Sequence, residues 1–78
     1  MFHTYVLKSE VTGKRYIGYT PDLYKRFEQH QRGTVPSTKF GIPWTLVYYE
    51  ACLDKDKAVQ REKYLKTGYG RRSLKDRL

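Results

Sequence analysis

The feature that most constrains the fold is a pair of β-type segments that lie close together near the start of the chain. Residues 3–8 (HTYVLK) and 15–20 (RYIGYT) are rich in β-branched and aromatic side chains. The segment between them contains Gly13, and a short connection with a glycine typically joins neighbouring antiparallel strands. The sequence therefore predicts a β-hairpin at the N-terminal end.

A helix is predicted directly after the hairpin. Thr20 is the expected N-cap, Pro21 suits the first helical position, and Asp22 is favoured near the positive end of the helix dipole. We expect this helix to run to about Arg32 and to stop at Gly33, because glycine commonly follows the last turn of a helix.

A loop and a third strand are predicted next. Residues 33–44 contain two glycines and two prolines and predict an irregular loop, of a length that is more often functional than idle. Residues 44–52 (WTLVYYEAC) are the most apolar β-type segment. We expect this segment to be the central strand of a sheet, because it is apolar enough to be covered on at least one face.

Two helices are expected to complete the chain. Asp54 is a candidate N-cap for a helix from Lys55 to Thr67, with Gly68 at its end. A short final helix is expected over residues 71–78, capped by Ser73. The predicted order of elements is that of an α+β fold.

The core of so short a chain has to come from ordinary apolar packing. The single cysteine, Cys52, cannot form an internal disulfide, and two histidines are too few for a Cys/His zinc framework. Eight tyrosines, three phenylalanines and one tryptophan provide large buried areas instead. No apolar run approaches a membrane span or a signal peptide. We therefore expect one domain over residues 1–78 in a reducing, cytoplasmic setting.

The charge of the chain points to a polyanionic partner. Sixteen Lys and Arg face eight Asp and Glu, which gives a net charge of +8, and residues 54–78 alone carry +5. Neutralisation of phosphates by Lys and Arg is the main sequence-independent term in nucleic-acid binding. A membrane surface is disfavoured, because no segment pairs a basic face with an apolar one. A role of the charge in solubility alone remains the alternative.

One of the eight carboxylates stands apart from the others. Most of them lie in turns, at helix starts or among cations, but Glu62 lies three or four residues from Ala58, Val59 and Leu65. This spacing places it on the apolar stripe of its helix. An ion pair with Lys66 or with Arg26 is the simpler explanation of such a carboxylate, and a bound metal ion is the alternative.

Two further side chains suited to phosphate chemistry lie on the first helix. Arg26 and His30 are four residues apart, at the edge of its apolar face. Arginine can bind a phosphate through two hydrogen bonds, and histidine can move a proton near neutral pH. A solvated arginine and a structural histidine are the alternatives. Tyr5 and Tyr16 lie mid-strand on the two arms of the hairpin, where packing in the core is the simplest role.

Together these residues resemble the GIY-YIG nuclease superfamily, in particular its small stand-alone members. The second half of the signature is literal in Tyr16-Ile17-Gly18, and the first tyrosine matches Tyr5. Residues 18–26 resemble the turn and helix that carry the family arginine, and residues 43–50 and 58–66 resemble the third strand and the helix of the metal-binding glutamate. Two departures stand out, because His3-Thr4 replaces the first Gly-Ile and the chain has no asparagine.

The resemblance implies a fold, an activity and a site. The implied fold is a three-stranded antiparallel sheet flanked by helices, and the implied activity is metal-dependent hydrolysis of DNA phosphodiester bonds. Glu62 would hold the metal ion, most simply Mg²⁺, with Mn²⁺ as a substitute. The implied catalytic residues are Tyr5, Tyr16, Arg26, His30 and Glu62. We expect the substrate to be contacted by Gly18, Lys14, Arg15, Thr38 and Lys66.

Other classes of function remain open from the residues alone. A nucleic-acid-binding module on the same scaffold would bind without cutting, and a basic structural protein of the ribosome-associated kind would prefer RNA. DNA is the expected partner of the enzyme, with RNA less favoured. A protein partner that supplies specificity is also expected, because the chain has no attached recognition domain.

Overall fold

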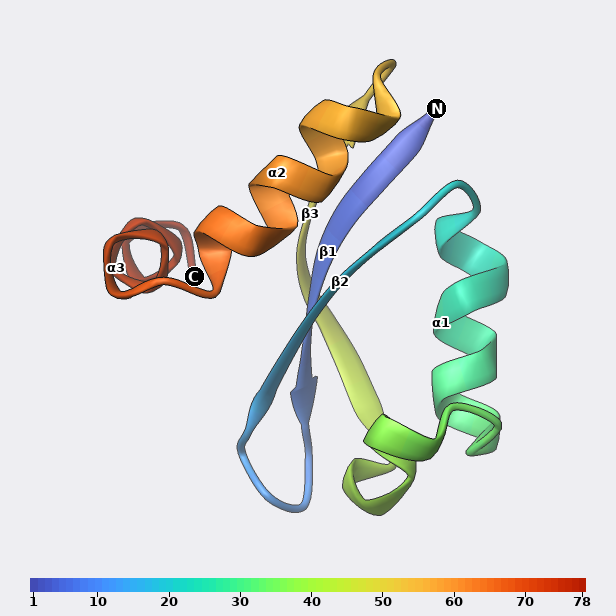
Figure 1. Cartoon of the computed structure of the whole chain (residues 1–78). Helices are drawn as coiled ribbons and strands as arrows, with labels where there is room; N and C mark the ends of the chain where they lie inside the picture. Colours follow the sequence, from blue (N-terminus) through green and yellow to red (C-terminus); the bar gives the residue numbers. More distant parts are fainter.

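A computed structural model describes all of residues 1–78 and confirms the α+β fold (Figure 1). Its elements, in chain order, are β1 (Phe2–Ser9), β2 (Arg15–Thr20), α1 (Leu23–Arg32), the 3₁₀ helix η1 (Pro36–Gly41), β3 (Trp44–Cys52), α2 (Lys55–Leu65) and α3 (Gly68–Arg77). The strands form one antiparallel sheet in the order β2-β1-β3. The longest helix has 11 residues, too few to cross a bilayer.

The prediction that the third strand is central was wrong. The central strand is β1, which pairs with β2 on one side and with β3 on the other. Residues 4–7 of β1 are all buried, whereas Trp44 is the only buried residue in β3. Apolar composition misled here, because the apolar side chains of β3 are only partly covered: Tyr48 packs against the core but still reaches solvent, and Tyr49 is 55% exposed.

The two faces of the sheet carry separate cores, because side chains alternate along each strand. One face packs against α1 and η1 through a cluster built on Tyr5, Leu7 and Trp44. The other face packs against α2 and α3 through Val6, Ile17, Leu65 and Leu74. Figure 1 shows the same division, with α1 on one side of the strands and α2 and α3 on the other.

The start of the first helix differs from the prediction by two residues. The N-cap is Asp22, whose Oδ1 accepts a hydrogen bond from the amide of Lys25 at 3.1 Å. Thr20 instead ends β2, and its Oγ1 accepts from the Asp22 amide at 3.1 Å. The predicted stop is confirmed, since Gly33 caps the helix in the left-handed region with φ of 76°.

The C-terminal boundaries also differ. The Asp54 cap is confirmed, but α2 ends at Leu65 and Gly68 starts α3 rather than ending α2. The cap of α3 is Thr67, not Ser73, and its hydroxyl accepts from the amide of Gly70 at 3.1 Å. The loop predicted over residues 33–44 contains η1, so part of it is regular.

Candidate active site

Tyr5 and His30 form the centre of the candidate site. Tyr5 lies mid-strand in β1 and is 1% exposed, and His30 lies in the last turn of α1 and is fully buried. The Tyr5 hydroxyl is 2.8 Å from Nε2 of His30. Two polar side chains far apart in sequence therefore meet inside the core, where each satisfies the other.

A third residue fixes the orientation of the imidazole. Nδ1 of His30 is 2.7 Å from Oγ1 of Thr38 in η1, and the same hydroxyl lies 3.3 Å from the carbonyl oxygen of Val35. A carbonyl can only accept, so the Thr38 proton points to it. We therefore assign the imidazole proton to Nδ1, which leaves Nε2 as the acceptor for the Tyr5 hydroxyl.

This arrangement changes the predicted role of Thr38. Its side chain was expected to contact the substrate, but Thr38 is 1% exposed and bonded to His30. It holds the imidazole in place instead. Trp44 in turn fixes η1, because its indole N–H donates to the carbonyl of Thr38 at 2.9 Å. Sequence reasoning missed this part of the site, since η1 was expected to be irregular.

Burial shifts both titratable groups at the centre of the site. It raises the pKa of Tyr5 to about 12, because the phenolate would lose its hydration; the Arg26 guanidinium opposes this rise, and Tyr16 and Glu62 add to it. Burial lowers the pKa of His30 to about 4, and the positive charge of Arg26 acts in the same direction. At neutral pH the pair is therefore an uncharged phenol bonded to an uncharged imidazole.

Tyr16 supplies a second phenol that differs from the first. Its ring lies 5.0 Å from the ring of His30 and 6.3 Å from that of Tyr5, measured between centroids. Tyr16 is only partly buried, and its hydroxyl has no hydrogen-bond partner in the chain. It is thus the tyrosine of the site with a free hydroxyl.

Gly18 is explained by the packing of these two rings. It pairs with Tyr5 across the hairpin, and a Cβ atom there would lie 2.6 Å from the Tyr5 hydroxyl and 3.2 Å from Cε1 of Tyr16. Contact between Gly18 and the substrate stays a prediction, because Gly18 is buried and the Tyr5 ring occupies the space beside it. The missing side chain makes room for the Tyr5 ring above the edge strand β2.

Charged groups approach the pair from two helices. Arg26 lies one turn before His30 on α1, is partly buried, and donates from Nη1 to Oε1 of Gln29 at 3.0 Å. Glu62 comes from α2, which packs on the other face of the sheet, and its charge nevertheless contributes to the pKa of Tyr5. A cation and an anion therefore both act on the pKa of the Tyr5 hydroxyl, in opposite directions.

Glu62 is mostly covered and has one cationic partner. Its side chain is 17% exposed, and its Oε1 lies 3.4 Å from Nζ of Lys66, one turn later on α2. The ion pair weighed from the sequence is therefore present. Because the side chain of Lys66 is 52% exposed and flexible, a metal ion could replace it at the carboxylate.

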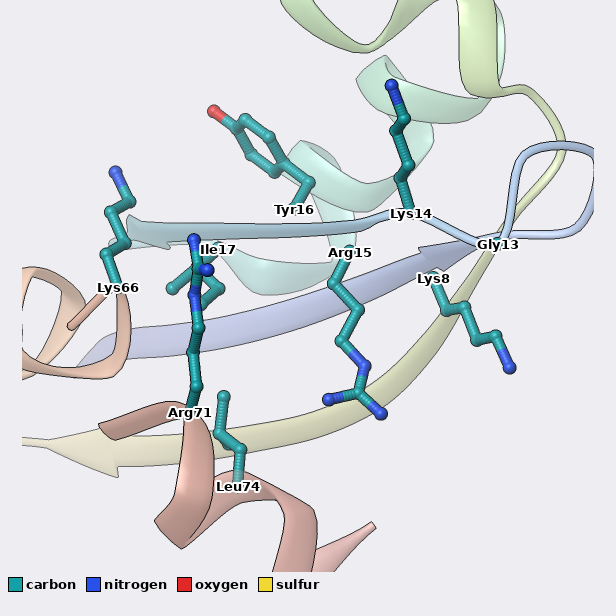
Figure 2. A pocket seen from close by; sticks show the side chains of 9 residues that line it. All are labelled: Lys8, Gly13, Lys14, Arg15, Tyr16, Ile17, Lys66, Arg71 and Leu74. Atoms are coloured by element: carbon teal, nitrogen blue, oxygen red, sulfur yellow. The ribbon is translucent and has the colours of Figure 1, made fainter. Parts of the chain in front are cut away.

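The predicted site residues divide into two groups in space. Tyr5 and His30 are buried between the sheet and α1, with the partly buried Tyr16 on β2 and Arg26 on α1, whereas Glu62 lies on α2 on the other face of the sheet. Lys14, Arg15 and Lys66 line a separate hollow that Tyr16 also borders. Figure 2 shows this hollow, which contains Lys8 and Arg71 as well, two cations that the sequence had not singled out.

Comparison with known proteins identifies the family of the chain. The model of the GIY-YIG catalytic domain matches residues 1–75. The chain belongs to the GIY-YIG family. This membership places the domain in a nuclease superfamily, and it confirms the resemblance drawn from Tyr5 and from Tyr16-Ile17-Gly18.

Relatives of similar size support the assignment. A UPF0213 protein of Staphylococcus saprophyticus is 35% identical over 74 residues, which cover 94% of this chain and 89% of that protein. A UPF0213 protein of Staphylococcus aureus is 39% identical over 64 residues, covering 81% and 77% of the two chains. The solution NMR structure of a UPF0213 protein from Bacillus halodurans superposes with a TM-score of 0.59 at 28% identity, covering 97% of this chain and 84% of that one.

Proposed function

We propose that this GIY-YIG domain is an endonuclease that hydrolyses phosphodiester bonds in DNA with the help of one divalent metal ion. The observation that carries the proposal is the buried Tyr5–His30 hydrogen bond, and the charges of Arg26 and Glu62 both act on the pKa of its phenol. A cation, an inward carboxylate and a phenol bonded to a neutral imidazole are the groups that phosphodiester hydrolysis needs.

The chemistry of the site fits a single Mg²⁺ or Mn²⁺ ion at Glu62. Mg²⁺ commonly binds through one or two carboxylates, completes its shell with water and substrate phosphate, and needs no protein cage. The chain has no group of three or more His, Cys, Asp or Glu side chains placed for a metal, so a site built on several carboxylates does not fit. The ion would neutralise negative charge on the scissile phosphate when bound.

The Tyr5–His30 pair provides a path for the proton of the attacking water. The Tyr5 oxygen accepts that proton while the Tyr5 proton moves to Nε2 of His30, 2.8 Å away. This transfer needs no phenolate in the resting protein, which suits a tyrosine whose pKa lies at about 12. Thr38 keeps Nδ1 protonated and so keeps Nε2 ready to accept.

Arg26 connects substrate binding to this transfer. In the free protein the positive charge of Arg26 helps to lower the pKa of His30. A phosphate bound to the guanidinium would offset that charge, so His30 becomes a stronger base when the substrate is in place. The same guanidinium stabilises the charge that grows on the phosphate during attack. The free hydroxyl of Tyr16 orients the attacking water.

Nicking of supercoiled plasmid DNA in Mg²⁺ tests the proposal. The wild-type protein is expected to convert supercoiled into open-circular DNA, and Glu62→Ala, purified in parallel, is expected to lose this activity. Addition of EDTA to the wild type should have the same effect. Equal residual cleavage by the two proteins would point to a contaminating nuclease and would reject the proposal.

One observation favours a second candidate, a binding module that does not cut. Glu62 is paired with Lys66, and this ion pair accounts for the carboxylate without a metal. Such a module would bind DNA or RNA in a salt-dependent way, with no turnover, and Glu62→Ala would leave its affinity unchanged. The buried Tyr5–His30 pair favours the enzyme, because a binding module has no need for a proton path in its core.

A further inference from the structure

A basic groove lies beside the candidate active site, between the hairpin and α3. Its larger hollow has a volume of about 780 Å³ and continues into a smaller one, and the two share Lys8 and Arg15. Figure 2 shows Arg15 extending from β2 toward α3 and Arg71 extending from α3 toward β2. The walls of the groove thus come from both ends of the sequence.

Most of the positively charged side chains in the groove have no acidic partner in the chain. Seven cations and no Asp or Glu side chain line its two hollows: Lys8, Lys14, Arg15, Lys66, Arg71, Lys75 and Arg77. Only two of them have an acidic partner, Lys66 with Glu62 and Arg77 with Glu50. The other five have no carboxylate within 4.0 Å. An anion from outside the chain would remove this repulsion.

One pair of cations in the groove works against the stability of the fold. Lys8 and Arg15 are directly opposite each other in the β1–β2 ladder, and both are exposed. Like charges directly opposite on one face of an antiparallel pair are destabilising. The hairpin therefore carries a pair of cations that repel each other. A bound polyanion would attract both of them and offset this repulsion.

Two residues link the groove to the candidate active site. Tyr16 lines the larger hollow, and the centroid of its ring lies 5.0 Å from that of His30. Lys66 lines the same hollow and is paired with Glu62. A chain of phosphates in the groove would therefore pass beside two residues that contact the site.

We propose that this groove binds the sugar–phosphate backbone of the DNA on one side of the scissile bond. The proposal rests on the proposed function for the direction in which the strand runs, toward Tyr16 and Glu62. The molecule is 28 Å in its longest dimension, so it can follow about eight nucleotides at about 3.4 Å each. All the groove contacts are charge contacts with phosphates, and they predict binding that is insensitive to base sequence.

Salt dependence of DNA binding tests the groove. The double variant Lys8→Gln/Arg15→Gln is compared with Lys55→Gln/Lys57→Gln, which removes the same charge from exposed positions of α2 outside the groove. Affinity for a fluorescent 20-base-pair duplex is measured without divalent metal over a range of NaCl concentrations. In the groove variant the slope of log K against log salt is expected to become shallower by about 2, and in the control it is expected to stay nearly unchanged.

The melting temperature of the same proteins distinguishes loss of a DNA contact from damage to the fold. Removal of the Lys8–Arg15 repulsion is expected to raise the melting temperature at low salt while it weakens DNA binding. A lower melting temperature together with weaker binding would mean that the variant had damaged the fold. In that case Arg71→Gln on α3 tests the groove independently, because it should also make the slope of log K against log salt shallower, by about 1.

The outcomes separate the groove from the enzyme. Equal loss of binding in the groove variant and the α2 control would overturn the groove, because only total charge would then matter. Tighter binding of polyglutamate than of DNA through the same residues would overturn it as well. If the wild type binds DNA through the groove but never cuts it in Mg²⁺, the groove stands and the proposed nuclease activity is rejected.

Discussion

At the scale of single residues, the site depends on a histidine that the fold keeps neutral. His30 is fully buried and bonded through both ring nitrogens, to Tyr5 and to Thr38. A proton added to its imidazole would place a charge in the core next to the positive charge of Arg26. The same burial that prepares Nε2 to accept a proton therefore makes the fold sensitive to acid.

The first prediction concerns stability against pH. The pKa of His30 is lowered from 6.5 in the unfolded chain to about 4 in the fold, so the unfolded state takes up a proton first as the pH falls. Stability is then lost between pH 6.5 and 4, by about 2 kcal/mol from pH 7 to pH 5. Urea unfolding at the two pH values measures the change. In His30→Gln this loss should disappear; a parallel decline in both proteins would contradict the assignment.

The second prediction concerns the carboxylate. Lys66 is partly exposed and competes with any cation for Glu62, so Lys66→Met is expected to tighten Mn²⁺ binding by about two- to fivefold, the worth of an exposed ion pair. Electron paramagnetic resonance of free Mn²⁺ measures this without DNA. Glu62→Gln is the matched variant and is expected to abolish binding at this site. Unchanged Mn²⁺ affinity in both variants would place the metal elsewhere.

The residues of the site could be singled out from the sequence, but their contacts could not. Tyr5, Arg26, His30 and Glu62 each occupied an unusual place in a periodic pattern or matched the family signature. The role of Thr38 required the position of η1, which brings it to Nδ1 of His30 from eight residues away. Such contacts depend on tertiary packing, and no local pattern encodes them.

At the scale of elements, the hairpin, the third strand and the helices follow from local signals, whereas the order of strands does not. Alternating side chains and the Gly13 turn were sufficient to predict β1 and β2. The place of β1 in the centre arises because β3 returns to pair with it. The boundary between α2 and α3 was missed because Gly68 was taken for a helix end, although Thr67 provides a capping hydroxyl there.

The third prediction tests how α3 is joined to α2. A Cβ atom at Gly70 would lie 2.0 Å from the carbonyl oxygen of Tyr64 and 2.6 Å from Cα of Leu65. Because these are backbone atoms that cannot move aside, Gly70→Ala is expected to destabilise the protein by about 1–3 kcal/mol or more. Chemical denaturation measures the change.

The matched control lies two residues earlier in the same helix. A Cβ atom at Gly68 would meet nothing within 4 Å, so Gly68→Ala is expected to leave stability unchanged or to raise it by up to about 1 kcal/mol. Since α3 provides Arg71 and Lys75 to the basic groove, Gly70→Ala should also weaken DNA binding. Equal stability of the two variants would mean that α3 does not pack against α2 in this way.

At the scale of the whole molecule, the net charge of +8 is organised rather than spread evenly. Seven of the sixteen Lys and Arg residues line the two hollows of the groove, whereas Arg26 lies on α1, which packs on the opposite face of the sheet from α3. The excess of charge in residues 54–78 could be read from the sequence. That this charge shares one groove with Lys8 and Arg15 could not be read from the sequence, because it depends on how α3 lies beside the hairpin.

The same organisation separates binding from chemistry. The cations of the groove are expected to set affinity, whereas Tyr5, His30, Arg26 and Glu62 are expected to set the rate of the chemical step. Substitutions in the two groups should therefore have different kinetic effects. Single-turnover cleavage at saturating protein isolates the chemical step from binding.

The most direct measurement is the single-turnover rate of cleavage of a labelled duplex in Mg²⁺ by the wild type, Tyr5→Phe and Glu62→Gln, with the affinity of each protein for the duplex determined in parallel. The rate of each variant is expected to fall by about 100-fold or more, because each lacks a group of the chemical step, while its affinity stays within about twofold, because the groove is intact. Cleavage by either variant at the wild-type rate, or a loss of rate matched by an equal loss of affinity, would contradict a catalytic site built on Tyr5, His30 and Glu62.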